Sequence, residues 1–303
     1  MLVFRYSAVR GVLAGLTIAD IQLAPDVRGL ELEVLPSSDA SLAVNVAEDG
    51  GGNYQCFAWL PANRWTRLSL PLEEFWLAEN SQDPDGRLDP RAVRRLTLLD
   101  LANLPGQVGL ALGLKDGPQC MVLGRIAFTR GAVEQRSFFH GLEALLDPLD
   151  RSPMLFLPIG GPALTIDPEV DSALRLEYAL GGYRWAGLVR GMGHLARKNA
   201  VGVKVAVRAE PPILLQVVAE ERDGSKYFSV VPVQTASEWT DAAVEFSRMR
   251  LSPDTADENG QLDPEQLRVI ILVADTFSSP LKVGQRGRVW LKNLRIIYGP
   301  QAR

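Results

Sequence analysis

Histidine and cysteine are scarce in this sequence. The 303-residue chain has only His140, His194, Cys56 and Cys120. Two histidines exclude a metal centre built from several histidine ligands, and two cysteines exclude the disulfide framework of a small secreted domain. The two cysteines could form one disulfide, but we interpret them as buried small apolar residues.

Long apolar runs and excess positive charge are also missing. The longest apolar runs, Met154 to Ile159 and Val269 to Ala274, have the length of a strand, whereas a membrane-spanning helix needs about 20 such residues. The net charge is −4 and the pI is near 5.4, which disfavours a general nucleic-acid binder. We therefore expect no membrane span and no nucleic-acid partner.

An internal repeat is the most informative feature that is present. The sequence Asp-Pro-Asp-Gly-Arg-Leu-Asp-Pro at residues 83–90 returns 174 residues later as Asp-Glu-Asn-Gly-Gln-Leu-Asp-Pro at residues 257–264. The match extends without a gap back to Trp65 and Trp239, with apolar residues at alternating positions. We infer duplication of a whole folding unit. The boundary is expected near Gly131, with units at residues 1–131 and 132–303.

The two units begin differently. Leu2 matches Leu174 at an offset of 172 residues, so residues 132–173 have no counterpart ahead of the first strand. Either the first unit lacks its opening strands or the chain is a piece of a longer protein. We favour the second alternative, because a missing strand exposes an unpaired sheet edge. The same match argues that the N-terminus is a strand and not a signal peptide, and we expect an extracytoplasmic location only if the chain belongs to a larger secreted protein.

Short alternating strands and tight turns fill both units. Gly29 to Val34 alternates apolar and charged residues, which is typical of a half-buried strand. Asp49-Gly50 and Asp223-Gly224 separate such segments and predict hairpins, and Asp89-Pro90 predicts a capped helical turn. Since strands do not alternate with long helices, we predict an all-β chain of two tandem antiparallel jelly-roll β-sandwiches.

The order of these features resembles the galactose-binding-domain-like sandwiches. Within them it is most similar to the family-11 carbohydrate-binding modules and to the complex I intermediate-associated protein family. The residues that carry the resemblance are Trp65, Asp85, Gly86, Leu88, Asp89 and Pro90, and again Trp239, Asn259, Gly260, Leu262, Asp263 and Pro264. The resemblance implies a non-catalytic sandwich that binds an extended polysaccharide in a concave groove, or a protein partner on the same surface.

Sugar binding requires flat aromatic rings beside groups that hydrogen-bond to hydroxyls. The candidate ligand-binding residues are Tyr54, Phe57, Trp59 and Trp76 in the first unit and Tyr183, Arg184, Trp185 and Tyr227 in the second. The repeat opposes unlike residues at several of these positions: Trp59 and Val233, Trp76 and Arg250, Asn53 and Tyr227. The two units therefore cannot share one aromatic strip. Trp65 and Trp239 are interpreted as core residues, because they occupy matched positions ahead of an alternating strand.

The repeated loop also suggests a cation. Asp83, Asp85 and Asp89 match Asp257, Asn259 and Asp263, and such oxygens suit calcium. Turn formation and helix capping explain the same residues, so we expect no cofactor and keep a structural calcium ion as an alternative.

Catalytic motifs are missing from the sequence. It contains neither a nucleophile elbow nor a phosphate-binding loop, and the adjacent acids in Glu73-Glu74 and Glu220-Glu221 would point to opposite faces of a strand. We therefore predict a non-enzymatic pair of polysaccharide-binding modules. The alternative is a protein-interaction or assembly module of the complex I intermediate-associated type, whose partner would be another protein or the domains of a longer parent chain.

Overall fold

The computed structural model describes most of the chain as strands. The described residues are 1–9, 12–78, 81–101, 116–130, 139–140, 143–147, 149, 155–167, 170, 172–181, 184–193, 199–234 and 236–299. They form two compact units. Unit 1 consists of Met1–Gln135, Leu155–Leu157 and Gly191–Leu195, and unit 2 consists of Arg136–Met154, Pro158–Arg190 and Ala196–Arg303.

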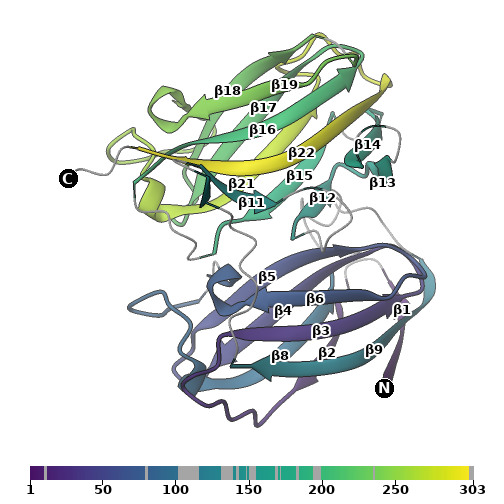
Figure 1. The fold of residues 1–303 in the computed structure, drawn as a ribbon, viewed down its shortest axis with the longest axis vertical. Coiled ribbons are helices and arrows are strands. Elements are labelled where there is room, and N and C mark those ends of the chain that lie inside the picture. The colour runs from purple at the N-terminus through teal and green to yellow at the C-terminus, as the bar shows by residue number, and fades with distance from the viewer. Residues whose placement is uncertain are drawn as a thin grey trace. The chain divides into compact units, whose positions relative to one another are not determined.

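Unit 1 is a sandwich of two antiparallel sheets (Figure 1). The first sheet has the order β1-β9-β3-β6 and contains β1 (Leu2–Ala8), β3 (Gly29–Pro36), β6 (Thr66–Pro71) and β9 (Gly117–Thr129). The second has the order β2-β8-β4-β5-β7 and contains β2 (Ala14–Ile18), β4 (Ala40–Glu48), β5 (Asn53–Leu60), β7 (Trp76–Leu77) and β8 (Val93–Asp100). The short 3-10 turn η1 (Leu72–Glu74) lies between β6 of the first sheet and β7 of the second, and the turn η2 (Pro90–Ala92) precedes β8 of the second sheet.

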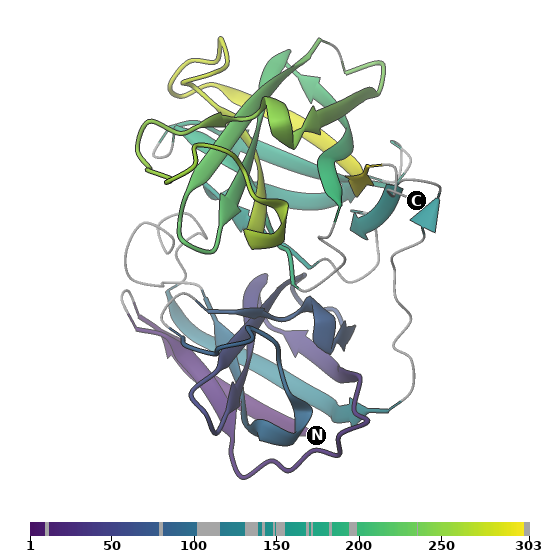
Figure 2. The ribbon, with the colours of Figure 1, turned by 90° about the vertical axis from the view of Figure 1, so that its left-hand side faces the viewer.

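Unit 2 is also a sandwich of two sheets (Figure 2). One sheet has the order β10-β11-β22-β14-β13, with β16 also paired to β22 and β19 paired to β16. Its strands are β10 (Phe139–His140), β11 (Glu143–Asp147), β13 (Ala163–Asp167), β14 (Ala173–Ala179), β16 (Ala200–Glu210), β19 (Thr240–Glu245) and β22 (Arg286–Tyr298). The other sheet has the order β12-β15-β21-β17-β18-β20. It contains β12 (Leu157–Ile159), β15 (Trp185–Gly191), β17 (Ile213–Glu221), β18 (Lys226–Val233), β20 (Arg250–Leu251) and β21 (Leu267–Asp275), and the turns η3 (Phe246–Arg248) and η4 (Pro264–Gln266) belong to the same unit.

The two units share one strand order. Strands β1 to β9 of unit 1 follow each other in the same arrangement as β14 to β22 of unit 2, and unit 2 adds β10 to β13. The all-β sandwich predicted from the sequence is confirmed.

Alternation along the strands places the core between the sheets. On β3, Leu30, Leu32 and Val34 are fully buried, whereas Glu31 and Glu33 lie on the outward face. Each buried aliphatic side chain of this kind contributes about 1.5–3 kcal/mol to folding. Cys56 is buried and Cys120 is partly buried, and the two are not joined in a disulfide. Among the described residues, no helix is long and apolar enough to span a membrane.

Candidate functional site

The same contacts hold the repeated loop in both units. The hydroxyl of Tyr54 donates a hydrogen bond to Asp83 in unit 1, and the hydroxyl of Tyr227 donates to Asp257 Oδ2 at 2.5 Å in unit 2. Tyr54 pairs with Leu77 of β7, just as Tyr227 pairs with Leu251 of β20. Tyr54, and not Asn53, is therefore the counterpart of Tyr227, because unit 2 has one additional residue between β18 and β19.

The second half of the loop is a capped turn. Asp89 accepts a hydrogen bond from the Arg91 N–H at 2.9 Å, and Asp263 accepts one from the Glu265 N–H at the same distance. Gly86 and Gly260 have φ values of +60° and +67°, which favour glycine. The helical caps predicted from the sequence are confirmed.

A glutamate from the preceding hairpin completes each loop. Glu48 Oε1 accepts from the Asp89 N–H at 2.6 Å, and Glu221 Oε1 accepts from the Asp263 N–H. Burial, together with the neighbouring aspartates, raises the pKa of both glutamates to about 7. Burial and the hydrogen bond to aspartate raise the pKa of both tyrosines, and the same hydrogen bond lowers the pKa of Asp257.

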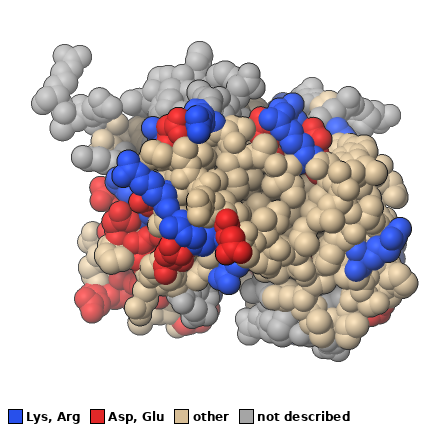
Figure 3. All heavy atoms as spheres, turned by 90° about the horizontal axis from the view of Figure 1, so that it is seen from below, with Lys and Arg blue, Asp and Glu red and all other residues tan. Residues whose placement is uncertain are grey.

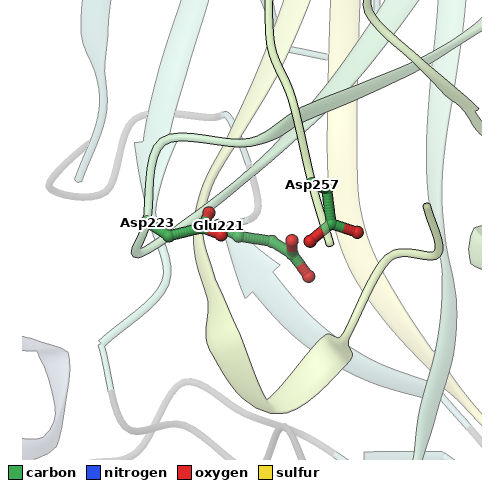
Figure 4. A group of neighbouring side chains, drawn as sticks. All are labelled: Glu221, Asp223 and Asp257. Atoms are coloured by element: carbon green, nitrogen blue, oxygen red, sulfur yellow. The ribbon is translucent and has the colours of Figure 1, made fainter. Parts of the chain in front are cut away.

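Three carboxylates meet at this place in unit 2. Glu221, Asp223 and Asp257 each offer an oxygen within 4.8 Å of the others (Figure 4). These oxygens suit a hard cation such as calcium. Asp223 also accepts from the Ser225 N–H at 2.8 Å, and Gly50 stands at its place in unit 1, where the same loop forms. The loop therefore folds without the third carboxylate, and a structural calcium ion stays the alternative to the expectation of no cofactor.

The cluster differs from the pattern expected from the sequence. Asn259 and Asp263 do not join Asp257 in it. Asn259 Oδ1 accepts from the Gln261 N–H at 2.6 Å, and Asp263 caps η4. Turn formation thus accounts for these two residues.

Four of the candidate aromatic residues are buried. Tyr54, Trp59, Trp76 and Tyr227 expose 0%, 6%, 3% and 1% of their surface. The two tyrosines anchor the loops, and Trp76 packs edge-on against Phe57 with 4.8 Å between ring centres. The two tyrosines are therefore loop anchors and not ligand platforms. Trp59 has the outward parity of Phe57 on β5, opposite to that of the buried Cys56 and Ala58. Ligand binding by Trp59 and Trp76 stays a prediction.

The remaining candidates lie at the start of β15. Arg184 is exposed and Trp185 is half-buried. The Arg184 guanidinium lies 5.8 Å from the centre of the Phe277 ring. Tyr183 lies outside the described residues. Their participation in ligand binding stays a prediction.

The interpretation of Trp65 as a core residue is wrong. Trp65 exposes 49% of its surface and lies just ahead of β6. A Cβ atom on Gly124 of β9 would lie only 3.3 Å from Trp65 Cζ3, so the ring covers this glycine on the outward face of the sheet. Strand parity could have predicted this exposure. Trp65 has the same parity as Arg67, whereas the buried residues of β6 are Leu68 and Leu70.

Charged side chains surround Trp65 on the same face. Glu31 lies 3.0 Å from Arg67 Nη2 and 3.7 Å from Arg125 Nη1. Glu33 Oε2 accepts from the Arg125 N–H at 3.3 Å and would lie 2.9 Å from a Cβ on Gly124. The buried oxygen Oε2 of Glu31 has no hydrogen-bond donor among the described residues. An exposed indole ring, two carboxylates and two guanidinium groups thus share one sheet face.

The matched Trp239 has different surroundings. It is half-buried and also lies outside the core. Arg208 Cζ lies 4.6 Å, and Lys292 Nζ 4.1 Å, from the centre of its ring. The strand register places Lys292 where unit 1 has Gly124, since Leu2 opposes Leu123 and Leu174 opposes Leu291. Two cations therefore lie against the ring of Trp239, while the ring of Trp65 lies over a glycine.

No model of a protein family matches the sequence. A search of curated proteins also finds no match.

Solved structures of carbohydrate-binding modules and of an agarase are similar to about half of the chain, at low sequence identity. A family 11 carbohydrate-binding module of a cellulosomal cellulase of Clostridium thermocellum is 13% identical with a TM-score of 0.42, covering 53% of this chain and 98% of that one. A family 30 module of another cellulosomal cellulase of that organism is 12% identical with a TM-score of 0.35, covering 54% and 99%. An agarase is 11% identical with a TM-score of 0.41, covering 53% of this chain and 25% of the agarase.

Proposed function

We propose that this protein is a non-catalytic carbohydrate-binding protein whose ligand surface is the outward face of sheet β1-β9-β3-β6. The observation that carries the proposal is the exposed Trp65 ring over Gly124, with Glu33 and Arg125 beside it. A pyranose ring stacks its C–H face on such an indole, and its hydroxyl groups pair with carboxylate and guanidinium groups. A sheet holds these groups rigidly, which limits the entropy lost on binding.

We further propose that the two units arose by duplication and form a pair with different ligands. The shared order of β1 to β9 and β14 to β22 supports the duplication. The two cations against the Trp239 ring support a difference in ligand, because the matched Trp65 ring of unit 1 is more exposed. The units would span residues 1–131 and 132–303.

A second candidate is a protein-interaction module. Exposed aliphatic residues at the N-terminal strands favour it: Met1, Leu2 and Val3 expose 92%, 47% and 40% of their surface. Such residues suit a protein partner better than a sugar.

Affinity electrophoresis of the full chain tests the carbohydrate proposal. The gels contain soluble β-glucans, xyloglucan, galactomannan or acidic polysaccharides, each run beside a gel without polysaccharide. We expect at least one polysaccharide to retard the chain, and Trp65→Ala to weaken binding about tenfold or more, which corresponds to about 1.4 kcal/mol.

Trp239→Ala is the matched control, because it removes the corresponding tryptophan of unit 2. Trp185→Ala tests the remaining prediction from the sequence. Retardation of Trp65→Ala equal to that of the unchanged chain would exclude the proposed surface. The absence of retardation on every gel would reject carbohydrate binding for these ligands.

A further inference from the structure

Strands β1 and β2 are edge strands, whereas their counterparts in unit 2 are not. β1 is the last strand of one sheet and β2 is the last strand of the other. In unit 2, β13 pairs with β14 and β12 pairs with β15. Among the described residues, nothing pairs with the outer edges of β1 and β2. In the part of unit 1 that the structure describes, two sheet edges are thus unpaired at the place where unit 2 has two additional strands.

The inward side chains of β1 are more exposed than their counterparts in unit 2. Leu2 exposes 47% of its surface, whereas the matched Leu174 exposes none. Phe4 is half-buried, whereas the matched Leu176 is 3% exposed. In the second sheet, Leu16 of β2 is half-buried, and the matched Leu188 is 2% exposed.

The exposed apolar surface of the protein is concentrated at this end of the sequence. Most of the exposed large hydrophobic residues occur within the first thirteen positions, namely Met1, Leu2, Val3, Val9, Val12 and Leu13. In the view of Figure 3, a broad area of the surface carries no Lys, Arg, Asp or Glu side chains. Apolar side chains that are exposed next to one another, as at Met1, Leu2 and Val3, mark an interaction site.

The edge is nevertheless ordered. β1 pairs with β9 along its whole length, from Leu2 opposite Leu123 to Ala8 opposite Gly117. Tyr6 donates a hydrogen bond to Asp100 of β8 at 2.5 Å, and its ring stacks on Phe4 with 4.8 Å between ring centres. The strand is therefore fixed in an extended conformation, with its outer row of N–H and C=O groups available for a further strand.

We propose that the β1 and β2 edges are the docking site for an extended segment of another polypeptide, which adds as a strand to β1. This proposal names the kind of partner for the second candidate function and does not depend on carbohydrate binding at Trp65. Main-chain hydrogen bonds to a sheet edge provide affinity in such complexes, and alternate side chains provide specificity.

Strand β13 of unit 2 indicates the register and the side chains that we expect for this segment. β13 adds antiparallel to β14 with Leu164 opposite Leu176 and Ala163 opposite Glu177. The same register on β1 would place an aliphatic side chain opposite Phe4, where it covers the inward row. Because Arg5 stands at the position of Glu177, an acidic residue opposite Arg5 would be favourable. A second copy that pairs β1 with β1 about Arg5 would instead bring two like charges together.

Fusion of a strand to the full chain tests the docking site. Residues 157–172 are copied and placed directly before Met1, which reproduces the spacing between β13 and β14 because the offset between the units is 172. We expect the β1 amides to exchange hydrogen at least about tenfold more slowly than in the unchanged chain, and unit 1 to melt at a higher temperature.

The control fusion carries Leu164→Asp in the copied segment, which would place a charge beside Phe4. Equal exchange of β1 in both fusions and in the unchanged chain would overturn the proposal. Exchange in the unchanged chain is a second measurement, and β1 amides as protected as those of β14 would also overturn it. Sedimentation shows whether a second copy takes the place of the segment, and a dimer disrupted by Val3→Lys would overturn the proposed occupant.

Discussion

Glu48 connects the hairpin and the repeated loop of unit 1, and burial raises the pKa of its carboxyl to about 7 from an ordinary 4.5. The folded state therefore favours the protonated carboxyl. The stability that this provides is present below about pH 4.5 and is lost as the pH rises through about 7, because the unfolded chain ionises freely in that range.

Replacing the carboxyl by an amide tests this linkage. Glu48→Gln keeps an oxygen for the Asp89 N–H but cannot ionise. We predict that it melts about 2–4 °C higher than the unchanged chain at about pH 8, and at the same temperature at about pH 4. Glu238→Gln, at an exposed position, is the control and should show no such pH dependence. A difference in melting temperature that is constant across pH would contradict the assignment.

The hydroxyl of Tyr227 offers a second test on single residues. Tyr227→Phe keeps the buried ring and removes the hydrogen bond to Asp257. We expect denaturant unfolding to show a lower free energy of unfolding than in the unchanged chain, because the loop loses its hydrogen bond to the β18 ring. The hydroxyl of Tyr178 is buried without a hydrogen-bond partner among the described residues, so Tyr178→Phe should be neutral or stabilising. Equal losses in the two variants would show that the hydrogen bond does not matter.

Single aromatic residues were the least predictable part of the candidate site. Composition and alignment could identify Trp59 and Trp65 but not their exposure. Trp65 was predicted to be a core residue because Trp239 repeats it, yet both lie outside the core. A matched position therefore shows only that both units use the residue, and strand parity is needed to tell which face it occupies.

Strands and turns were largely predictable. Alternation in Gly29–Pro36 and the Asp-Gly hairpins depend on local rules that the structure obeys. The loop caps at Asp89 and Asp263 follow from local chemistry in the same way. The alignment of β5 with β18 was less certain, because one additional residue before β19 shifts the match by one position, and only the pairing of Tyr54 and Tyr227 with the next strand reveals it.

At the scale of the whole molecule, the sequence predicted the repeat but not the pairing of the strands that only unit 2 has. Sequence comparison showed that residues 132–173 lack a counterpart ahead of Leu2. It could not show that two of the additional strands pair with β14 and β15, because edge pairing depends on contacts between distant segments. The exposure of Leu2 therefore became evident only beside the burial of Leu174.

The two units carry the same cap at distant positions, and this permits a test of their independence. Asp89→Ala and Asp263→Ala each remove a helix cap, which costs about 1 kcal/mol. Because the caps share no partner among the described residues, we predict that the losses add in the double variant within about 0.5 kcal/mol. Hydrogen exchange should become faster only in unit 1 for the first change and only in unit 2 for the second. Faster exchange throughout the chain after either change would instead show that the two sandwiches unfold as one cooperative body.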